Sequence, residues 1–327
     1  MKGFLFVTTP GARVSKKNNE LIVEIKNEKK RIPIGVINHV FLIGSVNITA
    51  SAIKFLSSRG RFLFLLNKFG KVISIVYPEL LGSDNSTRAA QYFIFSREDQ
   101  YFIFSREEKK LEITKELLKR KVFYSYDVIR NIFSSRKLKS EGLEDWRESI
   151  LSMIDSGNDN QAMLGIDGQI SKFLYSKFSS FNESPFYFDR REYYPPKDPV
   201  NALLSLSFSI FYSLMFPILI SKGFDPYLGF FHIKRGKHGA LCSDVMEIAR
   251  PKIIEFVFNT INDEFLEISD FVQSSSGVFL KKDALKSFLK LYSDVIIYER
   301  SDLTLAPVLD FVNWLRDYLK NEVSNYL

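Results

Sequence analysis

The first part of the chain alternates short apolar runs with polar turns. Turn-forming Gly and Asn residues separate the runs, and residues 67–70 have the composition of a hairpin turn. A short helix is expected over Ser51–Ser58. The runs are rich in β-branched and aromatic residues, which predicts strands over 3–9, 20–26, 39–44, 61–67 and 71–77. The pattern therefore predicts a β-rich domain over residues 1–83, built as a sandwich or roll.

The hydrophobic spacing changes after residue 83. Small and polar residues predict a linker over 84–90, and apolar residues then recur at helical spacing. Helices are expected over 107–133, 144–155, 159–178, 199–222, 243–262, 281–298 and 307–324. We therefore predict an α+β protein, in which the N-terminal β-rich domain is followed by a larger all-α domain over 91–327.

One predicted helix is apolar enough to pass for a membrane span. Residues 201–221 contain no charged side chain. Ser205, Ser209 and Ser213 recur every four residues after Asn201, which places a small polar stripe on one helix face and suits close packing inside a protein. Pro217 is expected to bend or end the helix. The pattern favours a central buried helix, and we predict no membrane span.

A nine-residue tandem repeat follows the predicted linker. The segment QYFIFSRED at 91–99 is repeated at once as QYFIFSREE at 100–108. In a continuous helix, nine residues advance by two and a half turns, so the two copies would face opposite sides. We therefore predict that one copy packs in the core and the other extends or bulges. The alternative is a duplication that is merely tolerated near a domain junction.

The composition of the chain indicates which kinds of partner it can bind and which cellular compartment it fits. The 327-residue chain carries a formal net charge of +7, which is compatible with a polyanionic partner such as nucleic acid or a membrane surface. The 31 Phe and 15 Tyr residues either fill cores or stack on bases and partner chains. A single cysteine excludes an intramolecular disulfide and fits a reducing cytoplasm, and the N-terminal apolar stretch is too short for a signal peptide.

One segment collects metal-binding and basic residues. His232 is followed by a short basic loop and then by a predicted helix that carries Asp244 and Glu247 on one face. One imidazole and two carboxylates suit a divalent cation such as Mg²⁺ or Mn²⁺, and the loop would hold phosphate oxygens. The loop residues are Lys234, Arg235 and Lys237. The simpler alternative is a structural histidine beside a solvated pair of acids.

A second basic segment lies just before the apolar helix. Arg190, Arg191 and Lys197 are interleaved with tyrosines, so the segment either contacts a nucleic-acid backbone or is a simple structural loop. Asp198 is placed to cap the helix that begins near Pro199.

The chain resembles a known family in three ordered blocks. PPKDPVNALLS, GFDPYLGFFH and SDVMEIARP occur in the order and spacing of the CRISPR-associated adaptation integrases, the first-numbered Cas family. The N-terminal part, with IPI at 32–34 and the stretch 51–71, is similar to the family's β-domain.

The resemblance implies a metal site and a reaction. His232 matches the family's histidine ligand, the acidic pair matches Asp244 and Glu247, and Glu247 is expected to be the direct ligand with Asp244 in support. Asp167 stands in the segment MLGIDG, where the family motif has a glutamate. The implied activity is that of an endonuclease and integrase dependent on Mg²⁺ or Mn²⁺, which inserts spacer DNA into the repeat array by transesterification. The alternative is a DNA-binding scaffold whose catalysis is weakened because Asp167 replaces the longer glutamate.

The resemblance also implies partners. They are protospacer and CRISPR-repeat DNA, a second copy of the chain in a homodimer formed through the N-terminal domain, and the small ferredoxin-like second-numbered Cas protein, which bridges two dimers.

Overall fold

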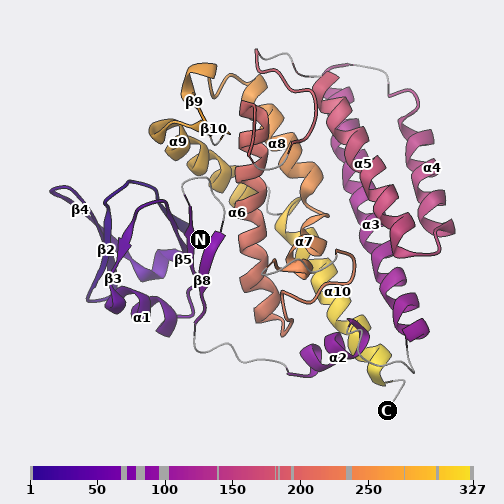
Figure 1. Cartoon of the computed structure of the whole chain (residues 1–327), viewed down its shortest axis with the longest axis horizontal. Coiled ribbons are helices and arrows are strands. Elements are labelled where there is room, and N and C mark those ends of the chain that lie inside the picture. Colours follow the sequence, from indigo (N-terminus) through magenta and orange to yellow (C-terminus); the bar gives the residue numbers. More distant parts are fainter. Residues whose placement is uncertain are drawn as a thin grey trace.

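The N-terminal residues form a β-domain beside a larger group of helices (Figure 1). The computed structural model describes residues 3–67, 72–78, 85–95, 103–137, 140–180, 182, 185–192, 195–232, 238–275, 277–299 and 302–324. The predicted α+β class is confirmed. The predicted hairpin turn at 67–70 lies mostly outside the described residues.

Two four-stranded sheets build the N-terminal domain. The first has the order β1 (Gly3–Val7), β5 (Ile37–Ile43), β7 (Leu63–Leu66) and β8 (Val72–Val76), in which only the β7–β8 pair is antiparallel. The second has the order β4 (Glu28–Pro33), β3 (Glu20–Ile25), β2 (Arg13–Lys17) and β6 (Asn47–Ile48). A short 3₁₀ turn covers Ile34–Val36, and helix α1 covers Ala50–Ser58. The five predicted strands and the short helix are confirmed, whereas β2, β4 and β6 were missed.

Strand β5 is buried on both faces, which explains its continuous apolar run. Val40 and Leu42 pack in a core that both sheets share with α1. Phe41 and Ile43 face the other way and belong to the core that continues into the helices. Phe41 stacks on Phe64 of β7, with ring centroids 4.6 Å apart. Alternate side chains of one strand therefore join the β-domain to the helical part.

Helices account for most of the chain after residue 84. The elements are α2 (Asn85–Phe95), α3 (Ile103–Ser135), α4 (Leu143–Ser156), α5 (Asn160–Ser180), α6 (Pro199–Ser221), α7 (Ala240–Met246), α8 (Arg250–Asn262), a 3₁₀ turn (Ile268–Asp270), β9 (Phe271–Ser274), β10 (Gly277–Leu280), α9 (Lys282–Tyr292), a π-helical segment (Ser293–Glu299) and α10 (Leu305–Ser324).

Three predictions for this part need correction. The C-terminal part is not all helix, because β9 and β10 pair as an antiparallel hairpin. The helix predicted over 243–262 is two helices, with Pro251 in the first turn of the second. Residues 85–90 of the predicted linker belong to helix α2, while 79–84 lie outside the described residues, so the domain boundary stays a prediction.

Helix α6 is the central buried helix that its pattern predicts. Asp198 caps it, because its side chain accepts a hydrogen bond from the Asn201 N–H at 2.8 Å. Pro217 lies inside the helix, which continues to Ser221, so of the two expected effects the helix end is excluded and the bend stays a prediction. The helix is long and apolar enough to cross a membrane, but 72% of its most apolar stretch is buried inside the protein. Burial of this kind is typical of a core helix.

The two copies of the repeat contribute to different helices. The first copy ends α2 and packs inward, with Gln91, Ile94 and Phe95 buried. Gln91 Nε2 donates to the backbone oxygens of Asp225 and Leu228, at 2.8 and 2.7 Å. The second copy begins α3, where Arg106 is buried. Residues 96–102 lie outside the described residues, so the predicted bulge is untested.

Candidate catalytic centre

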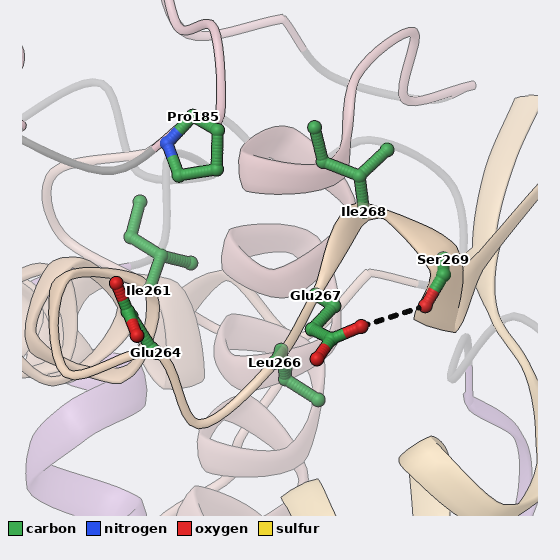
Figure 2. A pocket seen from close by; sticks show the side chains of 7 residues that line it. All are labelled: Pro185, Ile261, Glu264, Leu266, Glu267, Ile268 and Ser269. Atoms are coloured by element: carbon green, nitrogen blue, oxygen red, sulfur yellow. Dashed lines mark hydrogen bonds between the residues drawn. The ribbon is translucent and has the colours of Figure 1, made fainter.

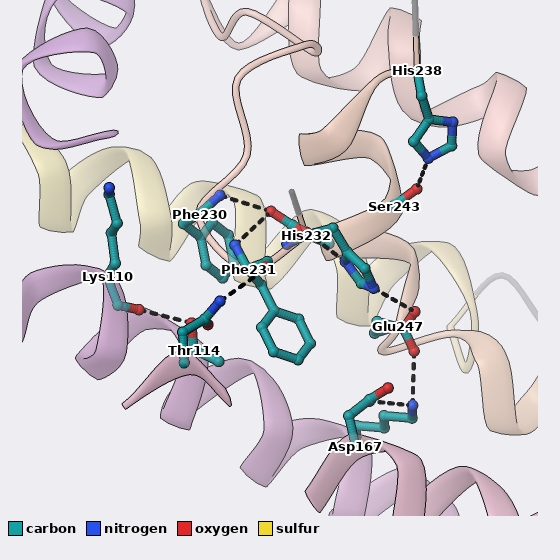
Figure 3. A network of polar contacts seen from close by, with 12 residues as sticks. Lys110, Thr114, Asp167, Phe230, Phe231, His232, His238, Ser243 and Glu247 are labelled. Atoms are coloured by element: carbon teal, nitrogen blue, oxygen red, sulfur yellow. Dashed lines mark hydrogen bonds and ion pairs between the residues drawn. The ribbon is translucent and has the colours of Figure 1, made fainter. Parts of the chain in front are cut away.

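Three residues that lie far apart in the sequence meet in the helical part of the protein (Figure 3). Asp167 lies in α5, His232 in the loop before α7, and Glu247 directly after α7. His232 Nε2 is 4.0 Å from Glu247 Oε1. Asp167 and Glu247 share a third partner, because Lys121 Nζ lies 2.5 Å from Asp167 Oδ1 and 2.7 Å from Glu247 Oε2. The three predicted ligands therefore belong to one cluster, in which Lys121 links Asp167 to Glu247 and Glu247 lies next to His232.

Asp244 fixes the position of His232. Its Oδ1 accepts from the His232 N–H at 2.9 Å and lies 2.7 Å from His232 Nδ1. Its Oδ2 accepts from the N–H groups of Phe230 and Phe231, at 2.8 and 3.2 Å. Both oxygens of this fully buried carboxylate are thus engaged, and the ring nitrogen Nε2 is directed toward Glu247. Asp244 is a positioning residue here.

The loop that carries His232 needs a glycine at 229. A Cβ atom there would lie 2.6 Å from Asp244 Oδ2 and 2.8 Å from Ala240 Cβ, closer than real Cβ contacts. Gly229 therefore lets the loop backbone approach α7 closely enough for Asp244 to bind the loop's N–H groups.

Glu247 does not lie within a helix, although its spacing from Asp244 predicts that it does. Its backbone angles are α-helical, but it is the C-cap residue of α7, and the turn 247–249 separates α7 from α8. Asp244 and Glu247 are both buried, so the alternative of a solvated acidic helix face is excluded. The break at 247–249 directs Glu247 toward Lys121 of α3 and Asp167 of α5.

Neighbouring charges keep the centre ionised. Burial alone would raise the pKa of Glu247, but Arg250 and Lys121 outweigh it and hold the pKa well below its ordinary value. Burial likewise opposes a charged Lys121, yet the carboxylates of Asp167 and Glu247 raise its pKa. Burial also lowers the pKa of His232, but its hydrogen bond to Asp244 and the charge of that carboxylate raise it overall. The buried groups thus stabilise one another in their charged forms.

The donor set fits a divalent cation in kind. One imidazole nitrogen and two carboxylates are ligands that Mn²⁺ accepts, and carboxylates also suit Mg²⁺. Among the described residues, however, no three His, Cys, Asp or Glu side chains stand close enough to hold an ion as they are. The ammonium of Lys121 contacts both Asp167 and Glu247.

Sequence reasoning missed Lys121, although a signal was present. Its neighbours on the same face of α3 are Thr114, Leu117, Ser125 and Val128, at steps of three and four residues. All of them are fully buried, as is Lys121 itself. A lysine on the buried face of a helix needs an anionic partner, so its spacing was a hint of buried carboxylates.

The predicted DNA-contact residues differ in the exposure and the hydrogen bonds of their side chains. Arg190 and Lys197 are about three-quarters exposed, at 76% and 75%, and lie near Glu192. Arg191 is different, because its guanidinium donates to Asn201 Oδ1 at 2.8 Å and to Ser205 Oγ at 3.0 Å. It holds the start of α6, and its predicted role as a phosphate contact stays a prediction. Lys234, Arg235 and Lys237 lie outside the described residues.

A pocket of about 350 Å³ lies apart from these residues (Figure 2). Its lining comes from Pro185, the end of α8 and the segment 264–269. Glu267 in this lining accepts a hydrogen bond from Ser269. The pocket contains none of the residues that meet at Lys121, so the candidate chemistry does not lie there.

The protein is therefore an α+β protein, in which a β-domain precedes a helical part that contains a histidine–carboxylate centre. The family model described as CRISPR associated protein Cas1 matches residues 5–294. This chain therefore belongs to the Cas1 family.

Curated relatives and solved structures agree with this assignment. A CRISPR-associated endonuclease Cas1 of Thermodesulfovibrio yellowstonii is 26% identical over 305 residues, which cover 91% of this chain and 92% of that protein. A casposase bound to its integration product has the same fold, with a TM-score of 0.80 and 21% identity over 98% of this chain and 91% of that one. A chain of a Cas6-RT-Cas1–Cas2 complex gives a TM-score of 0.79 and 21% identity, over 98% of this chain and 35% of that one.

Proposed function

We propose that this protein is a DNA integrase and endonuclease of CRISPR adaptation, which inserts spacer DNA into the repeat array by transesterification. The observation that carries the proposal is the cluster of Asp167, His232 and Glu247, linked through Lys121, in a chain of the Cas1 family. Asp167, His232 and Glu247 would hold Mg²⁺ or Mn²⁺. When bound, such an ion supplies the Lewis-acid charge that phosphodiester chemistry needs.

The chain's own residues position the centre and the DNA. Asp244 holds the imidazole of His232 in a fixed orientation, and the 30% exposed side chain of His232 leaves the centre reachable from solvent. Arg190 and Lys197 present exposed cations for phosphate oxygens. The formal net charge of +7 favours approach of a polyanion.

The proposed partners follow from the same family. We propose protospacer and repeat DNA as substrates, a homodimer formed through the N-terminal domain, and the second-numbered Cas protein as the bridge between two dimers, all in the cytoplasm. The integration product bound to the casposase supports the DNA substrate, and the Cas1–Cas2 complex supports the protein partner.

A strand-transfer assay with Mn²⁺ tests the proposed activity. The purified chain is mixed with a short duplex that carries free 3′-hydroxyl ends and a plasmid that contains a repeat. We expect joined product that disappears in EDTA, and at least about a hundredfold less product with Asp167→Ala, because a metal ligand contributes several kcal/mol to the transition state. The matched control is Asp283→Ala, which removes a 92% exposed carboxylate from α9. An Asp167→Ala variant that joins DNA as well as the wild type does would contradict the proposal.

One observation favours a second candidate, a DNA-binding scaffold with weakened catalysis. The short side chain of Asp167 is engaged by Lys121, and so is Glu247. In the same assay, DNA binding without strand transfer supports the scaffold. A sharp rise in product with Asp167→Glu would instead identify an active centre weakened by its shorter carboxylate.

A further inference from the structure

Lys121 has a complete set of acceptors inside the protein. Its Nζ contacts Asp167 Oδ1 at 2.5 Å and Glu247 Oε2 at 2.7 Å, and it donates to Ser171 Oγ at 3.1 Å. An ammonium has three N–H donors, so each of them has a partner. The side chain is fully buried, with no exposed surface. Lys121 is therefore a fixed member of the centre, unlike a surface lysine that samples many positions.

The carboxylates of the centre already have partners without a metal ion. Lys121 neutralises one side of Glu247, and Arg250 Nε lies 2.6 Å from its other oxygen, Oε1. Two cations, Lys121 and Arg250, thus pair with the carboxylates of Asp167 and Glu247, and Asp244 pairs with His232. A divalent cation added to this set would bring further positive charge next to Lys121 and Arg250, where water screens charge poorly.

The ammonium also occupies the space that a shared ion would need. Carboxylate oxygens bind Mg²⁺ at about 2.0–2.1 Å. An ion held between Asp167 Oδ1 and Glu247 Oε2 would lie where Nζ now lies, at 2.5 and 2.7 Å from these two oxygens. Lys121 and the ion are therefore alternatives at this position.

We propose that Lys121 is a resident cation of the centre, which neutralises Asp167 and Glu247 in the absence of metal and has to leave them before a divalent cation binds. The inference rests on the proposed function only in that both place a divalent cation at these carboxylates. It adds that the centre folds without metal and binds metal more weakly than its donors alone would. Lys121 thereby raises the concentration of divalent cation at which the centre binds it.

Mn²⁺ binding to the full chain without DNA tests the proposal. We expect Lys121→Met to bind Mn²⁺ with a Kd at least tenfold lower than that of the wild type, measured by calorimetry and by the electron paramagnetic resonance signal of free Mn²⁺. The double variant Lys121→Met/His232→Ala should lose this gain, which assigns the binding to the centre. The matched control is Lys119→Met, from the same helix, whose partly exposed side chain pairs with Asp155 and should leave the Kd unchanged.

Thermal unfolding covers the case in which Lys121→Met is unstable without metal. We expect Mn²⁺ to raise the Tm of Lys121→Met much more than that of the wild type, and to restore helical circular dichroism if the metal-free variant is unfolded. Equal or weaker Mn²⁺ binding by Lys121→Met, or no recovery in Mn²⁺ of either Lys121→Met or Lys121→Gln, would overturn the proposal. Strand transfer is scored separately, so an inactive wild type with tighter Mn²⁺ binding by Lys121→Met would reject the proposed activity alone.

Discussion

Replacing Asp244 with alanine is expected to lower the free energy of unfolding by roughly 3–5 kcal/mol, because a buried donor left without an acceptor costs about 1–3 kcal/mol. The variant would orphan the N–H groups of Phe230, Phe231 and His232 as well as the His232 ring. Asp244→Asn keeps the volume and one acceptor oxygen, so its effect should be about half as large. Urea denaturation followed by circular dichroism measures both.

The control for this prediction is the exposed Asp283. Surface substitutions away from special features usually change stability by less than about 0.5 kcal/mol, so Asp283→Ala should unfold like the wild type. An Asp244→Ala protein within about 1 kcal/mol of the wild type would mean that other groups satisfy the loop's N–H donors. It would also remove the structural reason for the orientation of His232.

Replacing His232 with alanine is expected to reduce strand transfer by at least about a hundredfold, since the proposed metal site would supply several kcal/mol of charge stabilisation. The protein should stay folded, because the His232 side chain is 30% exposed and its backbone N–H still donates to Asp244. The assay is the joining reaction with Mn²⁺, paired with DNA binding measured by fluorescence anisotropy. Binding is expected to stay within about threefold, because phosphate contacts dominate affinity.

His39 offers a matched histidine control for that experiment. It lies in β5 of the N-terminal domain, and its Nδ1 accepts a hydrogen bond from the Phe62 N–H at 3.3 Å. An amide oxygen can accept the same bond, so His39→Gln should join DNA at the wild-type rate. Equal activity of His232→Ala and wild type would exclude His232 from the chemistry, while equal losses in both variants would indicate a general loss of folding.

Continuous apolar runs predicted the elements that are buried on more than one face. The run HVFLI in β5 and the uncharged stretch in α6 are apolar because both are buried on nearly all sides. Strands β2 and β4 were missed because RVSKK and EKKRIP are largely polar and exposed, and each is placed mainly by pairing with β3. Local composition carries little information about such strands.

The sequence predicted the three proposed metal ligands of the candidate site, but not the lysine that pairs with two of them. Residue type and spacing predicted His232 and Glu247, the family resemblance added Asp167, and all three belong to one cluster. Lys121 lies 46 residues from Asp167 and 126 from Glu247, and their contacts depend on how α3, α5 and the turn after α7 pack together. Spacing along the sequence cannot predict a meeting of three separate elements. The same limit applies to Arg191, whose partners Asn201 and Ser205 lie on α6.

Anomalous diffraction from a crystal soaked in Mn²⁺ tests most directly whether these side chains form one cation-binding centre. We predict a single strong peak within bonding distance of Asp167, His232 and Glu247, with the Lys121 ammonium moved away from the two carboxylates and the peak higher in Lys121→Met. A crystal in which Mn²⁺ binds elsewhere, with these three residues unmoved even in Lys121→Met, would contradict the account.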